Sequence, residues 1–305
     1  MILKRKRVLA AKIETTPGTA VSLTAADAAM NIFDAEIQPQ IEFVERQGQG
    51  SFSQLPGTLG PEGGVATFAT ELVGGATVPK WASTLLPACG FVDASNVFSP
   101  KSEAPGSNVK TLTIALYQDG IVKKLRGCAG NVVFKFLAGK VVRVEFTFTG
   151  IWVAPTDTAI LSGITYPTTS PLRLVSSALT VGAWSPKIAE LTLDIGSQVV
   201  MREDAADASG YAHGLITGRK VSGSMNPEST LAATNNIFGD MTSRNEKALS
   251  AVLGSTGNKC TFAAPKLQWT NPQTADRGDL QTDQAAFQLN RSASAGDDEL
   301  TITFA

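Results

Sequence analysis

The segment from Gly139 to Gly150, GKVVRVEFTFTG, alternates strictly between apolar and polar side chains. Successive side chains of a β-strand point to opposite faces of the sheet, so this pattern predicts a strand with one buried and one polar face. The side chains predicted to lie in the core are Val142, Val144, Phe146 and Phe148. Those predicted on the polar face are Arg143, Glu145, Thr147 and Thr149. A fainter version at 299–304 places Leu300, Ile302 and Phe304 on one face.

Length and composition indicate a large core and say little about chemistry. A chain of 305 residues has room for roughly two domains, each long enough to bury a core. The formal net charge is −1, so no overall charge draws the chain to nucleic acid or membrane. Charged residues make up 17%, below the roughly 25% usual for soluble domains. Such a surface fits either a β protein rich in Thr, Ser and Gly, or a protein covered by copies of itself.

The predicted elements occur in the same order twice: strand, long loop, strand, helix and strand meander. The helices are expected at 78–90 and 236–253, and Asp119-Gly120 in the first meander is typical of a tight hairpin turn. This order predicts an all-β fold with minor α, made of two tandem β modules with a helix each. The first module would span 1–155 and the second 187–305, with a linker and connecting hairpin over 156–186.

Two polar segments are too long for ordinary hairpin turns. Arg46 to Gly64 is rich in Gln, Gly, Ser and Pro, and Arg202 to Gly218 occupies the same place in the second half. Loops longer than about a dozen residues are usually functional or disordered. The first segment nevertheless carries apolar side chains at regular intervals, which predicts that it docks on something.

The sequence offers no catalytic constellation. His213 is the single histidine and is expected to be an exposed loop residue, because one His cannot form a usual zinc site. The carboxylates at 203–207 and 297–299 lack EF-hand spacing and are expected to be solvated. Cys89, Cys128 and Cys260 are isolated and are expected to be buried apolar residues. We therefore expect no enzyme, no metal and no cofactor, and no apolar run reaches the length of a membrane helix.

Several stretches resemble the tail tube proteins, or major tail proteins, of long-tailed bacteriophages. They are AKIETTPGTA at 11–20, WASTLLPACGF at 81–91, the block from 112 to 157, and AELTLDIGSQVVMRED at 189–204. The stretches follow one another in the family's order over nearly the whole length, and the block from 112 to 157 is the most specific. The resemblance implies tail-tube-like β-sandwich or barrel modules.

The resemblance also implies a function and partners. Family members close into rings of six modules, and the rings stack into a tube through which viral DNA passes without sequence-specific binding. A chain with two modules would fill such a ring with three copies in pseudo-six-fold symmetry; the alternative is a hexameric ring. Other expected partners are the tape-measure protein and further tail proteins. The expected location is the virion, after assembly in the host cytoplasm, with no membrane association.

Specific residues acquire expected roles through this resemblance. The polar set Arg143, Glu145, Thr147 and Thr149 becomes a candidate for the lumen face. The loop starting at Arg46 corresponds to a loop that relatives lay on neighbouring subunits or the next ring, with Phe52, Leu55 and Leu59 as expected anchors. Tyr211 and Leu215 are the expected anchors of its counterpart. Deleting 50–60 is expected to leave a folded protein that cannot polymerise.

Two alternative functions remain open at this stage. One is another ring-forming tail component, such as a distal tail or tail terminator protein, which would form a single ring. The other is a carbohydrate-binding β-sandwich, although Trp81, Trp152, Trp184 and Trp269 are scattered instead of clustered.

Overall fold

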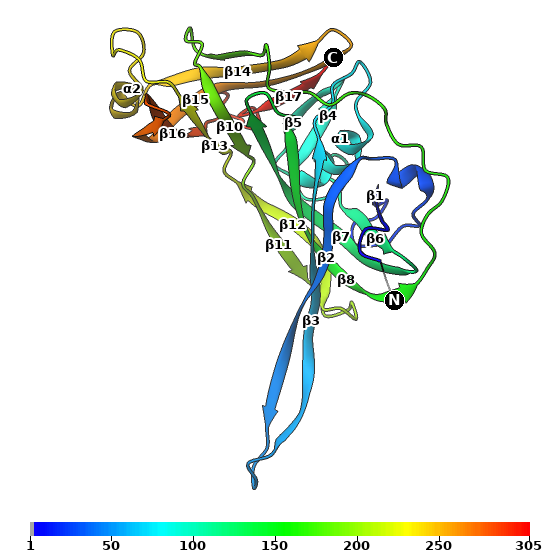
Figure 1. Ribbon diagram of the computed structural model, residues 1–305. Helices are drawn as coiled ribbons and strands as arrows, with labels where there is room; N and C mark the ends of the chain where they lie inside the picture. Colours follow the sequence, from blue (N-terminus) through cyan, green and yellow to red (C-terminus); the bar gives the residue numbers. More distant parts are fainter. Residues whose placement is uncertain (1–2) are drawn as a thin grey trace.

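The computed structural model describes residues 3–305, and antiparallel strands dominate it (Figure 1). The fold is all-β with minor α, as the sequence predicted. Two short α-helices, α1 (Lys80–Leu85) and α2 (Ile237–Ser243), accompany the 3-10 turns η1 (Ala25–Ala28) and η2 (Leu86–Cys89). Gly90 ends η2 in the left-handed conformation at φ 84°, as expected for the stop of that helical segment.

The strands are distributed over both halves of the chain. Those before residue 160 are β1 (Arg7–Ile13), β2 (Ile32–Gln47), β3 (Gln54–Glu71), β4 (Phe91–Ala94), β5 (Val97–Pro100), β6 (Leu112–Gln118), β7 (Ile121–Leu137) and β8 (Arg143–Asp157). Those after it are β9 (Ala178–Val181), β10 (Ile188–Asp194), β11 (Ser197–Glu203), β12 (Tyr211–Arg219), β13 (Ser222–Pro227), β14 (Glu246–Ser255), β15 (Asn258–Arg277), β16 (Leu280–Leu289) and β17 (Thr301–Phe304).

The two halves pair their strands in the same order. In the first half the neighbours run β2-β3-β8-β7-β6-β1, and in the second half β10-β13-β16-β15-β14-β9. Every one of these pairings is antiparallel. In both halves the α-helix lies between the third and fourth strands of the set in chain order, which are β3 and β6 for α1 and β13 and β14 for α2. The strand β9 lies inside the segment expected to be a connecting hairpin, but it pairs with β14 and belongs to the second set.

The two sets join edge to edge in one 15-stranded sheet. The end of β7 pairs with β10, with Phe134 opposite Leu193 and Phe136 opposite Leu191. A second connection runs through β5, which follows α1 and pairs with the C-terminal strand β17. The halves are therefore linked by two strand pairings of the main sheet as well as by the chain itself.

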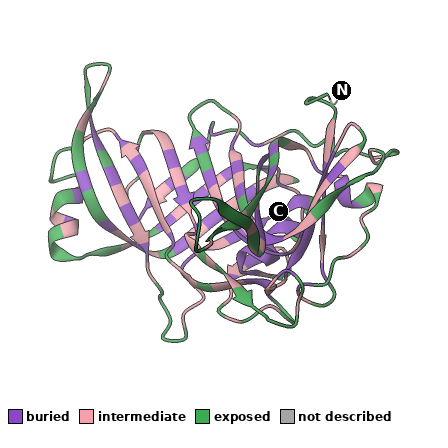
Figure 2. Cartoon of the chain, turned by 90° about the horizontal axis from the view of Figure 1, so that it is seen from below, coloured by how far each residue is buried: buried purple, intermediate pink, exposed green. Residues whose placement is uncertain are grey.

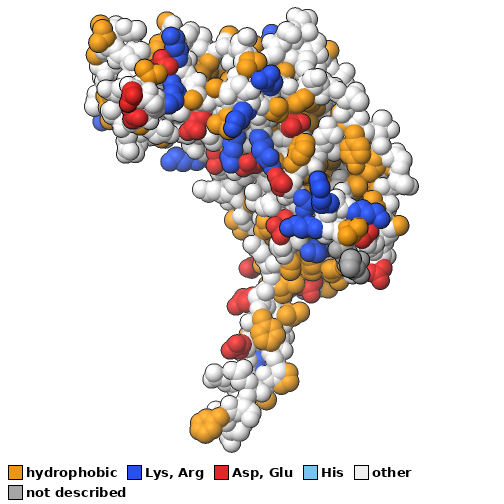
Figure 3. All heavy atoms as spheres, viewed as in Figure 1, with side chains coloured by type: hydrophobic (Ala, Val, Ile, Leu, Met, Phe, Trp, Pro, Cys, Tyr) orange, Lys and Arg blue, Asp and Glu red, His pale blue; other side chains and the backbone are white. Residues whose placement is uncertain are grey.

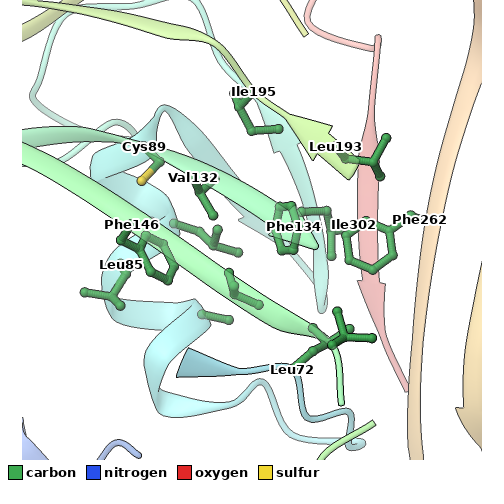
Figure 4. Close-up of a cluster of buried hydrophobic side chains, with 14 of the residues drawn as sticks. Leu72, Leu85, Cys89, Val132, Phe134, Phe146, Leu193, Ile195, Phe262 and Ile302 are labelled. Carbon is green, nitrogen blue, oxygen red and sulfur yellow. The ribbon is translucent and has the colours of Figure 1, made fainter. Parts of the chain in front are cut away.

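One core cluster runs through both halves in the described chain. Figure 4 shows Phe134 of β7 beside Phe262 of β15 and Ile302 of β17. The ring centroid of Phe262 lies 4.9 Å from that of Phe134 and 5.2 Å from that of Phe136, both edge to face. Such aromatic pairs contribute about 0.5–1.5 kcal/mol beyond the area they bury. The halves thus share a core, although each had been expected to bury its own.

The alternating segment forms β8, preceded by Val142. All seven side chains predicted for the core are buried, with at most 1% exposed: Val142, Val144, Phe146, Phe148, Leu300, Ile302 and Phe304. Figure 2 shows the same alternation as buried and less buried bands along the strands. The ring of Phe146 stacks on its neighbours Phe68 and Phe148, so the buried face of β8 packs as a continuous aromatic layer.

Three predictions of local structure were wrong. The predicted loops 46–64 and 202–218 are largely strand, because both are hairpins whose faces are not alternately buried and whose sequences therefore lack a period of two. The predicted helix 236–253 ends at Ser243, where Arg244 takes a left-handed φ of 56°, and β14 follows. Leu249, Ala251 and Leu253 are buried as alternate strand residues, which the helix-compatible residues between them concealed.

Candidate assembly surfaces

A long hairpin arm projects away from the body of the protein. It is formed by the outer parts of β2 and β3, paired from Gln40–Gly63 to Gln47–Gln54, and Figure 1 shows it extending downwards beyond all other elements. Phe52 at the tip is fully exposed, and Leu55, Leu59 and Arg46 are exposed as well. Figure 3 shows hydrophobic side chains along the arm and at its end. A row of exposed apolar side chains on a slender hairpin is unusual for a free surface, and such patches are typical of interaction sites.

The second hairpin, β11–β12, lies on the first half of its own chain. The Arg126 guanidinium of β7 donates to both carboxylate oxygens of Asp207, at 2.8 and 2.9 Å, and to the Gly18 carbonyl at 2.6 Å. The Glu62 N–H of β3 donates to the Ser209 carbonyl at 2.9 Å. Tyr211 and Leu215, expected to be anchors on another subunit, are half-buried in this intrachain hairpin.

The hairpin approaches the first half so closely that glycine is required there. A Cβ on Gly18 would lie 2.0 Å from the Ala212 carbonyl oxygen, and a Cβ on Gly127 would lie 3.0 Å from the His213 Cα. His213 is buried on β12, contrary to the expectation of an exposed loop residue, and its Nδ1 donates to the Gly214 carbonyl at 2.9 Å. Backbone packs on backbone here, so the hairpin has a fixed seat.

Glu14 fixes the segments of the first half on which the hairpin packs. Its buried carboxylate accepts from the N–H groups of Gly18 and Gly127, both at 2.8 Å, and from the hydroxyls of Thr111 and Thr113 at 2.7 and 2.8 Å. Four hydrogen bonds satisfy a carboxylate that would otherwise be costly to bury. Glu14 belongs to the 11–20 stretch and had not been singled out from the sequence.

Hydrogen bonding also fixes the ionisation of Asp207. The hydroxyl and N–H of Ser209 and the Arg126 guanidinium all donate to the Asp207 carboxylate, and together they lower its pKa to about 2. The carboxylate had been expected to be solvated, but it binds Arg126 and so attaches the β11–β12 hairpin to the first half. By contrast, burial raises the pKa of the Cys89 and Cys128 thiols, which lie in the core as predicted.

The candidate lumen residues share the face of β8 that is turned away from the core. Thr147 is exposed and lies in one row with Thr67 of β3 and Asn131 of β7. Arg143, Glu145 and Thr149 are half-buried. Lys135 Nζ lies 2.7 Å from Glu145 Oε2, and Arg143 pairs with Asp34 of β2. The cations on this part of the face are therefore neutralised by carboxylates.

Several strand edges of the main sheet lack a second partner within residues 3–305, those of β1, β4 and β9 among them, and two more lie at the ends of the path from β2 to β15. β2 is the terminal strand at one end of the strand order, with β3 on one side only. In β15, residues 258–268 pair with β14, but residues 269–277 pair with β16 alone. Unpaired edges are ready templates for pairing with another chain, and Pro39 in β2 and Pro272 in β15 limit how far such pairing can extend.

The described residues contain no group of three or more metal-binding side chains, and none of their helices is long and apolar enough to cross a membrane. Comparison with known proteins found no family model that matches this chain and no match among curated proteins.

Proposed function

We propose that this chain is a structural virion protein that polymerises into stacked rings, forming the tail tube of a long-tailed bacteriophage. One observation carries the proposal: the β7–β10 pairing inside the chain joins two sets of strands of the same order, and it leaves β2 and the outer part of β15 open. Within the repeated order, β15 corresponds to β7 and β2 corresponds to β10. The free edges of two copies can therefore meet as β7 and β10 do.

Repeating this pairing closes a ring. Each chain contributes the strands from β2 to β15 in the order β2-β3-β8-β7-β10-β13-β16-β15. Three chains, each with two sets, give a pseudo-six-fold ring and leave no open edge in this barrel. Closing a barrel removes the edges that otherwise promote uncontrolled pairing. Six chains per ring in an electron microscopy map would refute the three-chain ring.

The polar face of these strands suits a channel for DNA. Tight phosphate binding comes from unpaired Lys and Arg, and it would hinder sliding. The cations Lys135 and Arg143 are paired with carboxylates, and threonines and Asn131 provide uncharged polar groups between them. In this function the chain has no enzymatic step and no cofactor. Its partners are further copies of itself, the tape-measure protein and other tail proteins.

The open edge of β15 supplies a specific test. Gly278 and Asp279 have φ values of 58° and 65°, typical of a two-residue type I′ turn, so Arg277 and Leu280 form a hydrogen-bonded pair. Hydrogen-bonded and non-hydrogen-bonded pairs alternate along an antiparallel hairpin, so Thr274 and Asp283 form a non-hydrogen-bonded pair. The Thr274 N–H therefore points away from β16. The Thr274→Pro variant therefore removes a donor from the open edge while keeping the β15–β16 hydrogen bonds, whereas Thr274→Val keeps the donor.

Electron microscopy and mass photometry of the purified proteins distinguish the candidates. The natural chain and Thr274→Val are expected to form long tubes, and Thr274→Pro to remain as small species with the same circular dichroism. Single rings from the natural chain would instead favour a distal tail or tail terminator protein. Single chains at every concentration tested would reject the proposed function, and saturable glycan binding would revive the carbohydrate-binding alternative.

A further inference from the structure

The arm and the β11–β12 hairpin occupy the same place in the repeated strand order. The arm is inserted between the inner parts of β2 and β3, and β11–β12 is inserted between β10 and β13. The two insertions are similar in length, from the Gln40–Gly63 pair in the arm and from the Ser197–Arg219 pair in the second hairpin. One of them has a seat in this chain, and the other extends into solvent.

The seat of β11–β12 defines what such a hairpin rests on. It consists of the base of the arm at Pro61–Gly64, the adjoining part of β8, and Arg126–Ala129 of β7. The tip residues Ser209 and Gly210 reach the arm base, where Glu62 donates its N–H to Ser209. The hairpin of the second half thus lies across the first half, which precedes it in the order of strands around the sheet.

The second half has a corresponding surface, and it is open. There the base of the β11–β12 hairpin, the end of β16 and the segment before β17 surround a groove of about 630 Å³. Its walls include Thr217–Val221, Gln288–Arg291 and Ala295–Asp297. Thr217–Val221 corresponds to the arm base and Gln288–Arg291 to the middle of β8, which both belong to the seat in the first half. No part of the chain from residue 3 onward fills the groove as β11–β12 fills its counterpart.

We propose that the groove receives the β2–β3 arm of a second copy of this chain. The arm of the same copy points away from the second half, so it does not supply the occupant (Figure 1). The inference rests on the proposed ring, and it assigns both contacts to one neighbour. In that ring, β2 of one copy pairs with the open β15 edge of a neighbouring copy. The second half of this neighbour lies next to the arm that continues from β2, and so its groove takes the arm.

The chemistry of the two surfaces is compatible. The arm from residue 40 to 63 carries Glu42, Glu45 and Glu62 against a single cation, Arg46. In the groove, Arg219 is held by Asp297 and Glu299. Lys220 and Arg291, also in the groove walls, pair with no described carboxylate. The arm is thus net acidic, and the groove that would receive it carries two cations that form no ion pair within residues 3–305.

The arm would bring most of the apolar surface to this contact, through Phe52, Leu55 and Leu59. The groove walls include the apolar side chains Ile216, Val221 and Leu289. Matching the two hairpins from their base pairs places Leu55 of the arm where Tyr211 lies in the second hairpin. Phe52 then lies at the hairpin tip, next to the position of Ser209, which is the buried residue of the otherwise largely exposed tip of the second hairpin. A few desolvated aromatic and aliphatic side chains typically dominate such interfaces.

Photocrosslinking within assembled tubes tests this assignment. Phe52→benzoylphenylalanine chains labelled with ¹⁵N are mixed with unlabelled natural chains, assembled and irradiated, and the crosslinked peptides are identified by mass spectrometry. Crosslinks between a labelled and an unlabelled chain are expected at 217–221 or 288–299. The same probe at Leu55 serves if the first one blocks assembly, and a probe at the exposed Phe238 of α2 is the control.

The outcomes separate this inference from the function on which it rests. Tubes in which both arm probes crosslink elsewhere, or to nothing, overturn the groove assignment and leave the tube function standing. If the natural chain forms no tubes, the function itself fails. As a second readout, the Lys220→Glu/Arg291→Glu variant is expected to raise the chain concentration needed for tubes about tenfold, whereas Lys140→Glu outside the groove leaves it unchanged.

Discussion

Phe262 joins the two halves of the core, and its replacement tests whether they unfold as one unit. The side chain is fully buried on β15 and contacts Phe134 and Phe136 of the first half. Truncating a buried Phe to Ala typically costs about 3–5 kcal/mol. Two edge-to-face contacts place Phe262→Ala in the upper part of that range, near 5 kcal/mol. For a chain of this size, about 2 °C per kcal/mol gives a fall in Tm of roughly 10 °C.

Hydrogen exchange followed by mass spectrometry reports on each half separately. Because the halves share a core, peptides from β6 in the first half and β14 in the second are expected to lose protection together in Phe262→Ala. Leu280→Ala, at an exposed hairpin end, is the control and should stay within about 0.5 kcal/mol of the natural chain.

A double-mutant cycle with Phe134→Ala measures the contact across the halves directly. Its expected coupling energy is about 0.5–1.5 kcal/mol. Loss of protection confined to the second half, together with zero coupling, would refute the shared core as a stabilising unit.

Three further substitutions probe the seat of β11–β12. Glu14→Gln is expected to lower the free energy of unfolding by about 2–4 kcal/mol, since an amide NH₂ would face hydrogen-bond donors; an unchanged urea midpoint would contradict this. Gly18→Ala should release the hairpin and speed proteolysis at 203–211 at least tenfold, on the scale of a lost 1.4 kcal/mol. Asp207→Asn should cost about 1 kcal/mol at pH 7, because solvent screens a carboxylate that is 25% exposed. The folded pKa of Asp207 lies below its unfolded value, so this stabilisation is present above about pH 4 and is lost as the pH falls towards 2; an equal difference at pH 2 would be evidence against it.

Burial patterns explain which elements the sequence predicted. β8 has one face in the core and one outside, so its period of two is visible, and its predicted core residues Val144, Phe146 and Phe148 are all buried. The Asp119-Gly120 turn was also confirmed, with φ values of 43° and 102°. Where both faces of a strand are exposed, as in the arm, no period exists to be found. Phe52 was nevertheless predicted as a contact residue, because it is a large apolar side chain in a polar stretch; the structure places it fully exposed at the arm tip, and its contact role stays a prediction.

The parts that remained hidden depend on contacts between distant segments. Arg126 and Asp207 lie far apart in sequence, and nothing local marks them as partners. Glu14 is one acidic residue in a short strand-to-turn segment, and its four donors come from three separate places in the chain. The repeated order of elements was visible as a pattern, but the sharing of one core by both halves was not, because hydrophobic periodicity shows which side chains are buried and not what they pack against.

The junction between β7 and β10 has a consequence for the concentrations at which rings would form. A joint made within one chain requires no encounter between molecules, since the linker holds its two sides at an effective concentration of roughly millimolar order. In a ring of three such chains, half of the joints exist before any subunit meets another. Ring formation would then rise with the third power of the chain concentration instead of the sixth. Tubes would begin to grow from dilute protein, where six separate modules would still be dispersed.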